Sequence, residues 1–216
     1  MDIKSGQIIT NFSEIESLVN ESFAEMNVSH EEITYKPMIL DEQNFYNASK
    51  AFLPKLYHAP VSEEIYSKLQ GFKVSGISKR YQYLFFIKKG PFEDVYSIFM
   101  HEFSHGLNEG VVKKFDNAQM IGCAVSEIMA YSFQYWSCEV LQKLHPEYDV
   151  NPLLALAGHS LAVEDNPELR KTEHGIAALA LFEIYKQMPY PKSFERVYKK
   201  LRTSLSGLEK IEVISA

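Results

Sequence analysis

The spacing of apolar residues changes near residue 90 of the chain. Beyond that point apolar positions recur every three or four residues and prolines separate the segments, a pattern that predicts consecutive helices. These predicted helices cover residues 92–107, 118–144, 152–163, 168–187 and 192–204. The first part is mixed: it has aromatic and β-branched runs, which predict strands, and amphipathic runs, which predict helices. The predicted strands are 32–40 and 80–88, and the predicted helices are 13–26, 41–52 and 62–70.

This organisation indicates a mainly helical α+β fold, with a small N-terminal sheet packed over the helix at 92–107. We expect one domain over residues 1–216, mixed in residues 1–90 and helical in residues 91–216. With 216 residues and 46% hydrophobic content, the chain can bury a sizeable core. Ser13 and Glu16 have the spacing of a capping box, which predicts the start of the first helix there.

The most informative polar residues are His101, Glu102 and His105, in the run His-Glu-Phe-Ser-His. Two histidines four residues apart lie on one face of a helix, so both imidazoles can bind a single metal ion. Glu102 is adjacent and can act on a water at that metal, which is the HExxH arrangement of zinc hydrolases. Apolar residues at helical spacing predict that this helix is buried: Val95, Ile98, Phe99 and Phe103. Zinc would satisfy its polar groups, and the alternative is a surface helix whose histidines face water.

Glu127 is the best candidate for a third ligand. It follows His105 by some twenty residues, which leaves room for a loop and the first turns of a second, antiparallel helix. The segment around it is apolar, and a lone carboxylate is costly to bury unless it is paired. A solvated glutamate on the outer face is the alternative. Glu109 and Glu139 are weaker candidates, because the first is too near His105 and the second too far along the same helix.

This combination resembles the gluzincin type of zinc metallopeptidase. Residues 99–107 and 124–136 are similar to the zinc-binding helices of the thimet oligopeptidase and oligopeptidase F family, and residues 175–181 are similar to a helix near that family's C-terminus. The resemblance implies a zinc peptidase with Glu102 as its base. The chain departs from the family at Ser104, where members usually have glycine, and in its length, because members are far larger.

A second resemblance is to the small regulatory peptidases of the ImmA/IrrE type. Glu127, Ala130 and Phe133 have the spacing found in the helix after the zinc motif of those proteins. That resemblance implies a compact cytoplasmic enzyme that cleaves a protein partner, which suits the length of this chain. The leucine-methionine-proline run expected after the phenylalanine is missing.

Zinc with three protein ligands keeps one position open for water, whose pKa falls to about 7 on the metal. Glu102 would accept the proton of this water and later pass it to the leaving amine. The developing oxyanion needs a further donor, for which the candidates are His174, His159, Tyr131 and Tyr135. We favour His174, because it precedes an apolar helix and lies next to residues 175–181; a surface or capping histidine is the alternative.

The histidine ligands also need acceptors for their second ring nitrogens. Related enzymes place an acidic residue four positions after the glutamate ligand, where this chain has Tyr131. The acceptors are therefore expected elsewhere, at Asp94, Asp116 or a main-chain carbonyl. The strand at 80–88 ends just before the zinc helix, where gluzincins often have the edge strand along which an extended peptide pairs; a core strand is the alternative.

The sequence therefore predicts a zinc-dependent metallopeptidase that binds one Zn²⁺ and acts on a peptide or protein substrate. Two alternatives stay open: a zinc-dependent amidase, and a regulatory or binding protein that keeps zinc for structure. Glu102 disfavours the structural role, because a structural ion needs no base.

Composition restricts the partners and the location. A formal charge of −6 and a pI near 5.7 favour no nucleic-acid partner, and no apolar run approaches the roughly 18 residues of a membrane span. Cys123 and Cys138 lie too far apart on one predicted helix to pair, which favours a reducing compartment. The first residues lack the apolar core of a secretory signal, so we expect a cytoplasmic protein, with a processed export precursor as the alternative. The sequence indicates no oligomeric state.

Overall fold

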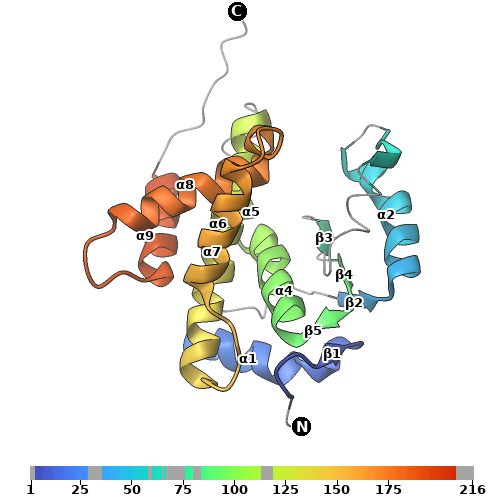
Figure 1. The fold of residues 1–216 in the computed structure, drawn as a ribbon, viewed down its shortest axis with the longest axis horizontal. Helices are drawn as coiled ribbons and strands as arrows, with labels where there is room; N and C mark the ends of the chain where they lie inside the picture. The colour runs from blue at the N-terminus through green and yellow to red at the C-terminus, as the bar shows by residue number, and fades with distance from the viewer. Residues whose placement is uncertain are drawn as a thin grey trace, which may run out of the picture.

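The structure, a computed structural model, describes residues 3–28, 36–57, 60–64, 66, 76–79, 84–112 and 119–207. It is mainly helical, with two small sheets (Figure 1). The helices are α1 (Glu16–Glu25), α2 (Glu42–Tyr57), α4 (Phe92–Leu107), α5 (Glu109–Val112), α6 (Gln119–Leu144), α7 (Pro152–Glu164), α8 (Glu173–Gln187) and α9 (Phe194–Ser206), with 3-10 turns at Phe12–Glu14 and Leu169–Lys171. The strands are β1 (Ile8–Ile9), β2 (Lys36–Leu40), β3 (Gly76–Lys79), β4 (Leu84–Lys88) and β5 (Gly90–Pro91).

The three-stranded sheet has the order β2-β4-β3, with β2 parallel and β3 antiparallel to β4. The predicted strand at 80–88 is therefore confirmed over β4, and residues 80–83 lie outside the described residues. β4 is the central strand: Ile87 pairs with Ile39 on one side and with Gly76 on the other. The expectation that this strand offers a free edge to a peptide is wrong for the described residues, because neighbouring strands occupy both of its sides.

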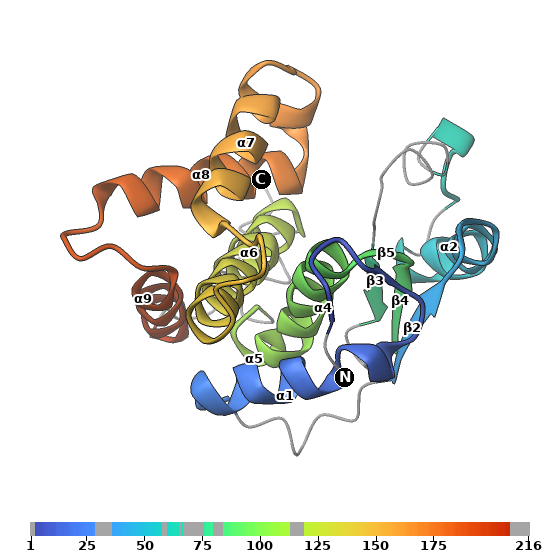
Figure 2. The ribbon, with the colours of Figure 1, turned by 60° about the horizontal axis from the view of Figure 1, so that its bottom comes forward.

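Helix α4 is the central element, and it lies between the three-stranded sheet and α6 (Figure 2). It packs against β3 and β4 on one side and most extensively against α6 on the other. Helix α2 contacts β2 and β4 and stands at the outer side of the sheet, away from α4 (Figure 2). Helix α6 also packs against α8 and α9. The predicted mainly helical fold with small sheets is confirmed, and the three-stranded sheet contacts α4. The packing of this sheet over the helix as in zinc metallopeptidases, and the single domain, stay predictions.

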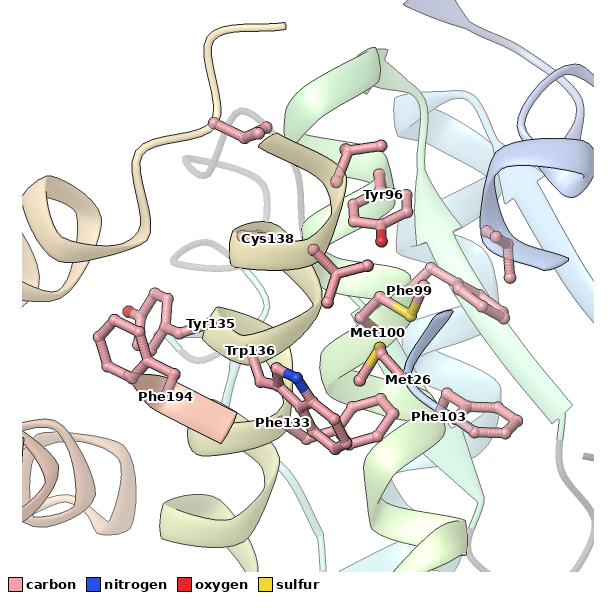
Figure 3. Packing of buried hydrophobic residues seen from close by; sticks show 14 of the residues in the cluster. Met26, Tyr96, Phe99, Met100, Phe103, Phe133, Tyr135, Trp136, Cys138 and Phe194 are labelled. Carbon is pink, nitrogen blue, oxygen red and sulfur yellow. The ribbon is translucent and has the colours of Figure 1, made fainter. Parts of the chain in front are cut away.

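Aromatic side chains fill the space around α4 and α6 (Figure 3). Phe103 of α4 is fully buried, with its ring centroid 4.6 Å from Phe23 of α1 and 6.2 Å from Phe133 of α6. Tyr96 is also fully buried, and its hydroxyl donates to Ser22 Oγ at 2.8 Å. A buried side chain of this size contributes about 1.5–3 kcal/mol of transfer free energy. This packing holds α4 on the faces that do not carry the histidines.

The first turn of α4 is tied to the N-terminal segment. The Ser5 hydroxyl donates to Glu93 Oε1 at 2.5 Å, and the Gly6 main-chain nitrogen donates to the same carboxylate at 3.0 Å. Gly6 has φ of +74°, a left-handed conformation that glycine adopts without a Cβ penalty. Because β1 pairs with β5 directly before α4, these contacts fix where the helix begins. Glu93 and Asp94 in its first turn also favour a helix start there, since carboxylates stabilise the N-terminal end of the helix dipole.

Two helix starts differ from the prediction. The capping box expected at Ser13 and Glu16 is wrong: Asn11 and Glu14 form it, around the 3-10 turn that precedes α1. The helix predicted from residue 168 begins as α8 only at Glu173, where the Thr172 hydroxyl accepts from the main-chain nitrogen of Gly175.

Other predictions fall partly on residues that are not described. In the predicted helix at 62–70, residues 65 and 67–70 lie outside the described part, as do residues 29–35 of the chain, which include the start of the strand predicted at 32–40. Among the described residues, no helix has the combination of length and apolar character needed to cross a membrane. Both cysteines lie on α6 outside any disulfide of the described residues, and burial raises the pKa of Cys138 to about 12.

Candidate metal centre

His101 and His105 of α4 meet Glu127 of α6, and one ligand atom from each lies within 4.8 Å of the other two. Nε2 of His101 is 3.1 Å from one Glu127 oxygen, and Nε2 of His105 is 3.6 Å from the other. Both histidines are buried and the Glu127 side chain is 12% exposed. The predicted convergence of these three residues is therefore found, and they form a group that could hold a metal ion.

The antiparallel packing of α4 against α6 produces this convergence. From Ser97 to His105 along α4, the partner positions on α6 fall from Gln134 through Met129 to Ser126. Residues four apart stack on one helix face, which places Ser97, His101 and His105 in a single row toward α6. The facing row on α6 contains Glu127 and, seven positions later, Gln134, which is the helical repeat of about two turns.

The charges of this group depend on one another. Burial alone would raise the pKa of Glu127, but the neighbouring His105 and the hydrogen bond with His101 outweigh it, and the pKa falls well below its usual range. Burial alone would lower the pKa of His101, but the hydrogen bond and charge of Glu127 outweigh it and the pKa rises. Glu127 therefore stays ionised, and its negative charge favours a positive charge between the two histidines. Two imidazole nitrogens and one carboxylate are a donor set suited to zinc, so the residues fit such an ion.

The second ring nitrogens of both histidines have hydrogen-bond partners, but not the expected ones. Nδ1 of His101 lies 3.0 Å from Oε1 of Gln134, and Nδ1 of His105 lies 2.8 Å from the Ser126 hydroxyl. The expected acceptors were Asp94, Asp116 or a main-chain carbonyl, and Asp116 lies outside the described residues. The spacing of Glu127 and Gln134 on α6 was the available signal.

Glu102, the predicted base, is buried in α4 next to His101. Its charge is among the causes that raise the pKa of His101 and the pKa of Tyr131, which places its carboxylate within electrostatic range of both side chains. The position is compatible with action at the group, and the role as a base stays a prediction.

His174, the predicted oxyanion donor, comes from α8 to the same group. Its Nε2 lies 3.4 Å from Oε2 of Glu127, and its ring is nearly parallel to that of His101, with centroids 6.4 Å apart. The His174 side chain is 56% exposed, in contrast to the ligand histidines. It therefore stands at the solvent side of the group, and its catalytic role stays a prediction.

The other donor candidates are placed differently. The ring of Tyr131 lies edge-on to the ring of His101, with centroids 4.7 Å apart, and edge-on to the ring of His159, with centroids 5.1 Å apart. Tyr131 therefore stands directly beside a candidate ligand, and His159 stands behind Tyr131. Burial, followed by the charge of Glu127, raises the pKa of Tyr131, which keeps the phenol neutral. The ring of Tyr135 is 5.2 Å from that of Phe194, which directs it into the core rather than toward the histidines.

Ser104, where the resembled family has glycine, is fully buried at the crossing of α4 and α6. Its hydroxyl donates to the main-chain oxygen of Met129 at 3.4 Å and accepts from the Asn108 amide at 2.8 Å. Asn108 in turn accepts from the Tyr198 hydroxyl of α9 at 2.9 Å. The serine is therefore accommodated by a hydrogen-bond chain that joins three helices behind the histidines.

Glu139, a weaker ligand candidate, has another position. It accepts from the main-chain nitrogens of Phe194 and Glu195 at 2.8 and 3.4 Å, so it caps the start of α9. Burial raises its pKa despite these two bonds. This agrees with the preference for Glu127 over Glu139.

Comparison with protein-family models, with curated proteins and with solved structures found no match to this chain. The similarities to the oligopeptidase F and ImmA/IrrE families therefore rest on the motif residues alone. What the geometry defines by itself is a mainly helical protein with a buried His-His-Glu group that could bind a metal.

Proposed function

We propose that this protein is a zinc-dependent metallopeptidase in which His101, His105 and Glu127 hold one Zn²⁺ ion and Glu102 is the general base. The observation that carries the proposal is the convergence of the three ligand atoms within 4.8 Å, with a buried glutamate directly after the first histidine. A structural zinc site is usually closed by four protein ligands, whereas three ligands leave a position for water or substrate.

When bound, zinc supplies Lewis acidity that polarises a carbonyl group and increases the acidity of water. Glu102 accepts the proton from the attacking water and then delivers it to the leaving amine, which is general acid–base catalysis by a single carboxylate. His174, at the solvent side of Glu127, donates a hydrogen bond to the oxyanion that develops on the substrate carbonyl.

The proposed substrate is a peptide or a protein partner. The support is the likeness of the two zinc-binding helices to those of known peptidases and the position of β3 beside α4. Within the described residues β3 is an outer strand of its sheet, so its free edge offers main-chain groups to an extended peptide. An amidase would use the same carbonyl chemistry, and the choice of substrate distinguishes the two.

The test combines metal analysis with one conservative substitution. Purified protein should contain close to one zinc per chain after metal repletion and should cleave members of a peptide library. Glu102→Gln should keep the zinc and lose about 10²–10⁴-fold in hydrolysis rate. Glu183→Gln, at an exposed glutamate paired with Lys186 on α8, is the matched control and should behave as the wild type. A protein that binds no zinc, or a fully active Glu102→Gln variant, contradicts the proposal.

A further inference from the structure

The side-chain amide of Gln134 links two residues on the histidine face of α4. Its nitrogen donates to the Ser97 hydroxyl at 2.6 Å, and its oxygen lies 3.0 Å from Nδ1 of His101. Ser97 is one helical turn before His101, so the amide spans a single turn of α4 from the opposite helix. The two ends of one side chain thus have different partners on the same face.

These contacts select one form of the His101 ring. An amide oxygen can only accept, so Nδ1 of His101 must carry the hydrogen at this contact. Nε2 lies 3.1 Å from Oε2 of Glu127, which also only accepts, so in the metal-free pair Nε2 carries a hydrogen as well. A metal ion would take the place of that hydrogen, and Nδ1 would keep its own. In this arrangement the Ser97 hydroxyl accepts from the amide nitrogen, so the amide is held at both ends and its oxygen is the atom that faces the ring.

His105 is held less strictly. Its Nδ1 faces the Ser126 hydroxyl at 2.8 Å, and a hydroxyl can either donate or accept. The Ser126 contact orients the ring without selecting the position of its hydrogen. Among the two histidines, His101 alone meets an acceptor-only group at Nδ1 in the described structure.

We infer that Gln134 is a positioning residue that, braced by Ser97, fixes His101 in the tautomer and ring orientation that metal binding requires. The inference rests on the metal site of the proposed function and adds a residue to it. An amide performs this task where a carboxylate is common. A carboxylate at residue 134 would add a third negative charge to a buried region that already contains Glu102 and Glu127, at a desolvation cost that an amide avoids.

The first test is zinc affinity, measured by competition with a chelator. Gln134→Leu keeps the approximate size and removes the acceptor, so zinc affinity should fall about 10–100-fold. Gln134→Glu restores an acceptor, so its affinity should stay within about threefold of the wild type or exceed it. The matched control is Gln142→Leu, on the exposed end of the same helix, which should bind as the wild type. Wild-type affinity in Gln134→Leu overturns the inference.

The second test reports the hydrogen itself. In cobalt-substituted protein, each coordinated imidazole should give a paramagnetically shifted, exchangeable N–H signal. Gln134→Leu should broaden or remove one of the two signals by exchange with solvent, and Gln134→Glu should retain both. If both signals persist unchanged in Gln134→Leu, the amide does not hold the ring. Should Gln134→Leu not fold, Ser97→Ala decides: it should lower zinc affinity about threefold or more, and an unchanged affinity counts against the brace.

Neither measurement uses peptide hydrolysis. A wild type that binds zinc, shows these effects and cleaves nothing would contradict the peptidase proposal and leave the role of Gln134 intact. If the wild type cleaves peptides and Gln134→Leu retains wild-type zinc affinity, the peptidase proposal stands and the role of Gln134 is contradicted.

Discussion

Nε2 of His174 lies 3.4 Å from Oε2 of Glu127, so an imidazole from α8 meets the carboxylate that α6 brings to the histidines of α4. The two partners differ in environment, because the His174 side chain is 56% exposed and the Glu127 side chain is 12% exposed. This contact connects the buried group to solvent.

We predict that His174→Ala keeps its zinc and lowers kcat/KM about 100-fold, because one hydrogen-bond donor to the transition state is lost. Metal content and steady-state kinetics on a library-selected peptide measure the two effects. His145→Ala, a surface histidine paired with Glu21 and Glu147, is the control and should change neither quantity. Zinc loss as large as in His105→Ala would make His174 a ligand, and unchanged kinetics would remove it from catalysis.

We predict that Glu127→Ala weakens zinc binding at least about 100-fold, because it removes both a ligand and the negative charge that favours a cation at this site. Chelator competition on the folded variant measures the change. Glu139→Ala on the same helix should retain wild-type zinc affinity, since that carboxylate caps α9 instead. Equal zinc binding by Glu127→Ala and the wild type would place the third ligand elsewhere.

Without metal, the pairing of His101 with Glu127 should make stability depend on pH. The lowered pKa of Glu127 stabilises the fold above the ordinary value of 4.5, and this contribution is lost as the pH falls through the folded-state pKa. The raised pKa of His101 stabilises the fold below the ordinary value of 6.5, and this contribution is lost as the pH rises through the folded-state pKa. Both contributions are present together between pH 4.5 and 6.5.

Urea unfolding of chelator-treated protein measures this dependence. The difference in unfolding free energy between the wild type and Glu127→Gln should be largest inside that window and should shrink on either side. With zinc present, the stabilisation of the wild type should instead increase as the pH rises, because zinc binding requires a deprotonated His101. A difference that does not vary with pH would mean that the two groups do not titrate as a pair.

We predict that Tyr198→Phe lowers the free energy of unfolding by about 1–3 kcal/mol, because it leaves the buried Oδ1 of Asn108 without its donor. Thermal or denaturant unfolding measures the loss. Tyr190→Phe, on a side chain that is 91% exposed, is the matched control and should be neutral. Zinc affinity should persist in both variants, since the hydrogen-bond chain lies behind the histidines; equal stability of the two variants would contradict the prediction.

The residues that could be predicted from the sequence are those identified by their spacing along the chain or by their immediate neighbours. His101 and His105 share a helix face by periodicity alone, and Glu127 stood out as a carboxylate in an apolar helix. Gln134 was missed because the acceptor for a histidine nitrogen can be one of many residue types, and only the register between α4 and α6 selects it. Counting seven positions on from Glu127 along one helix face was the available signal.

Errors in the secondary structure have the same origin. β3 has only four residues and is defined by its pairing with β4, a long-range contact that local pattern does not contain. The capping box was assigned to Ser13 because Asn11, which forms it, stands only two residues earlier with its own acidic partner. At α8, the turn before the helix packs directly against Gly175: a Cβ there would lie 1.9 Å from the main-chain oxygen of Leu169. The predicted start at residue 168 missed this turn, because the close approach is a tertiary contact.

The interval between Glu127 and Gln134 limits which changes of length α6 can accept. One inserted or deleted residue between them rotates the following side chain by about 100° around the helix axis. The Glu127 carboxylate and the Gln134 amide could then no longer both contact His101. A change of side chain in this interval can leave both contacts in place, whereas a change in the number of residues cannot. Relatives that bind metal in this way should therefore tolerate substitution at the intervening positions and conserve their number.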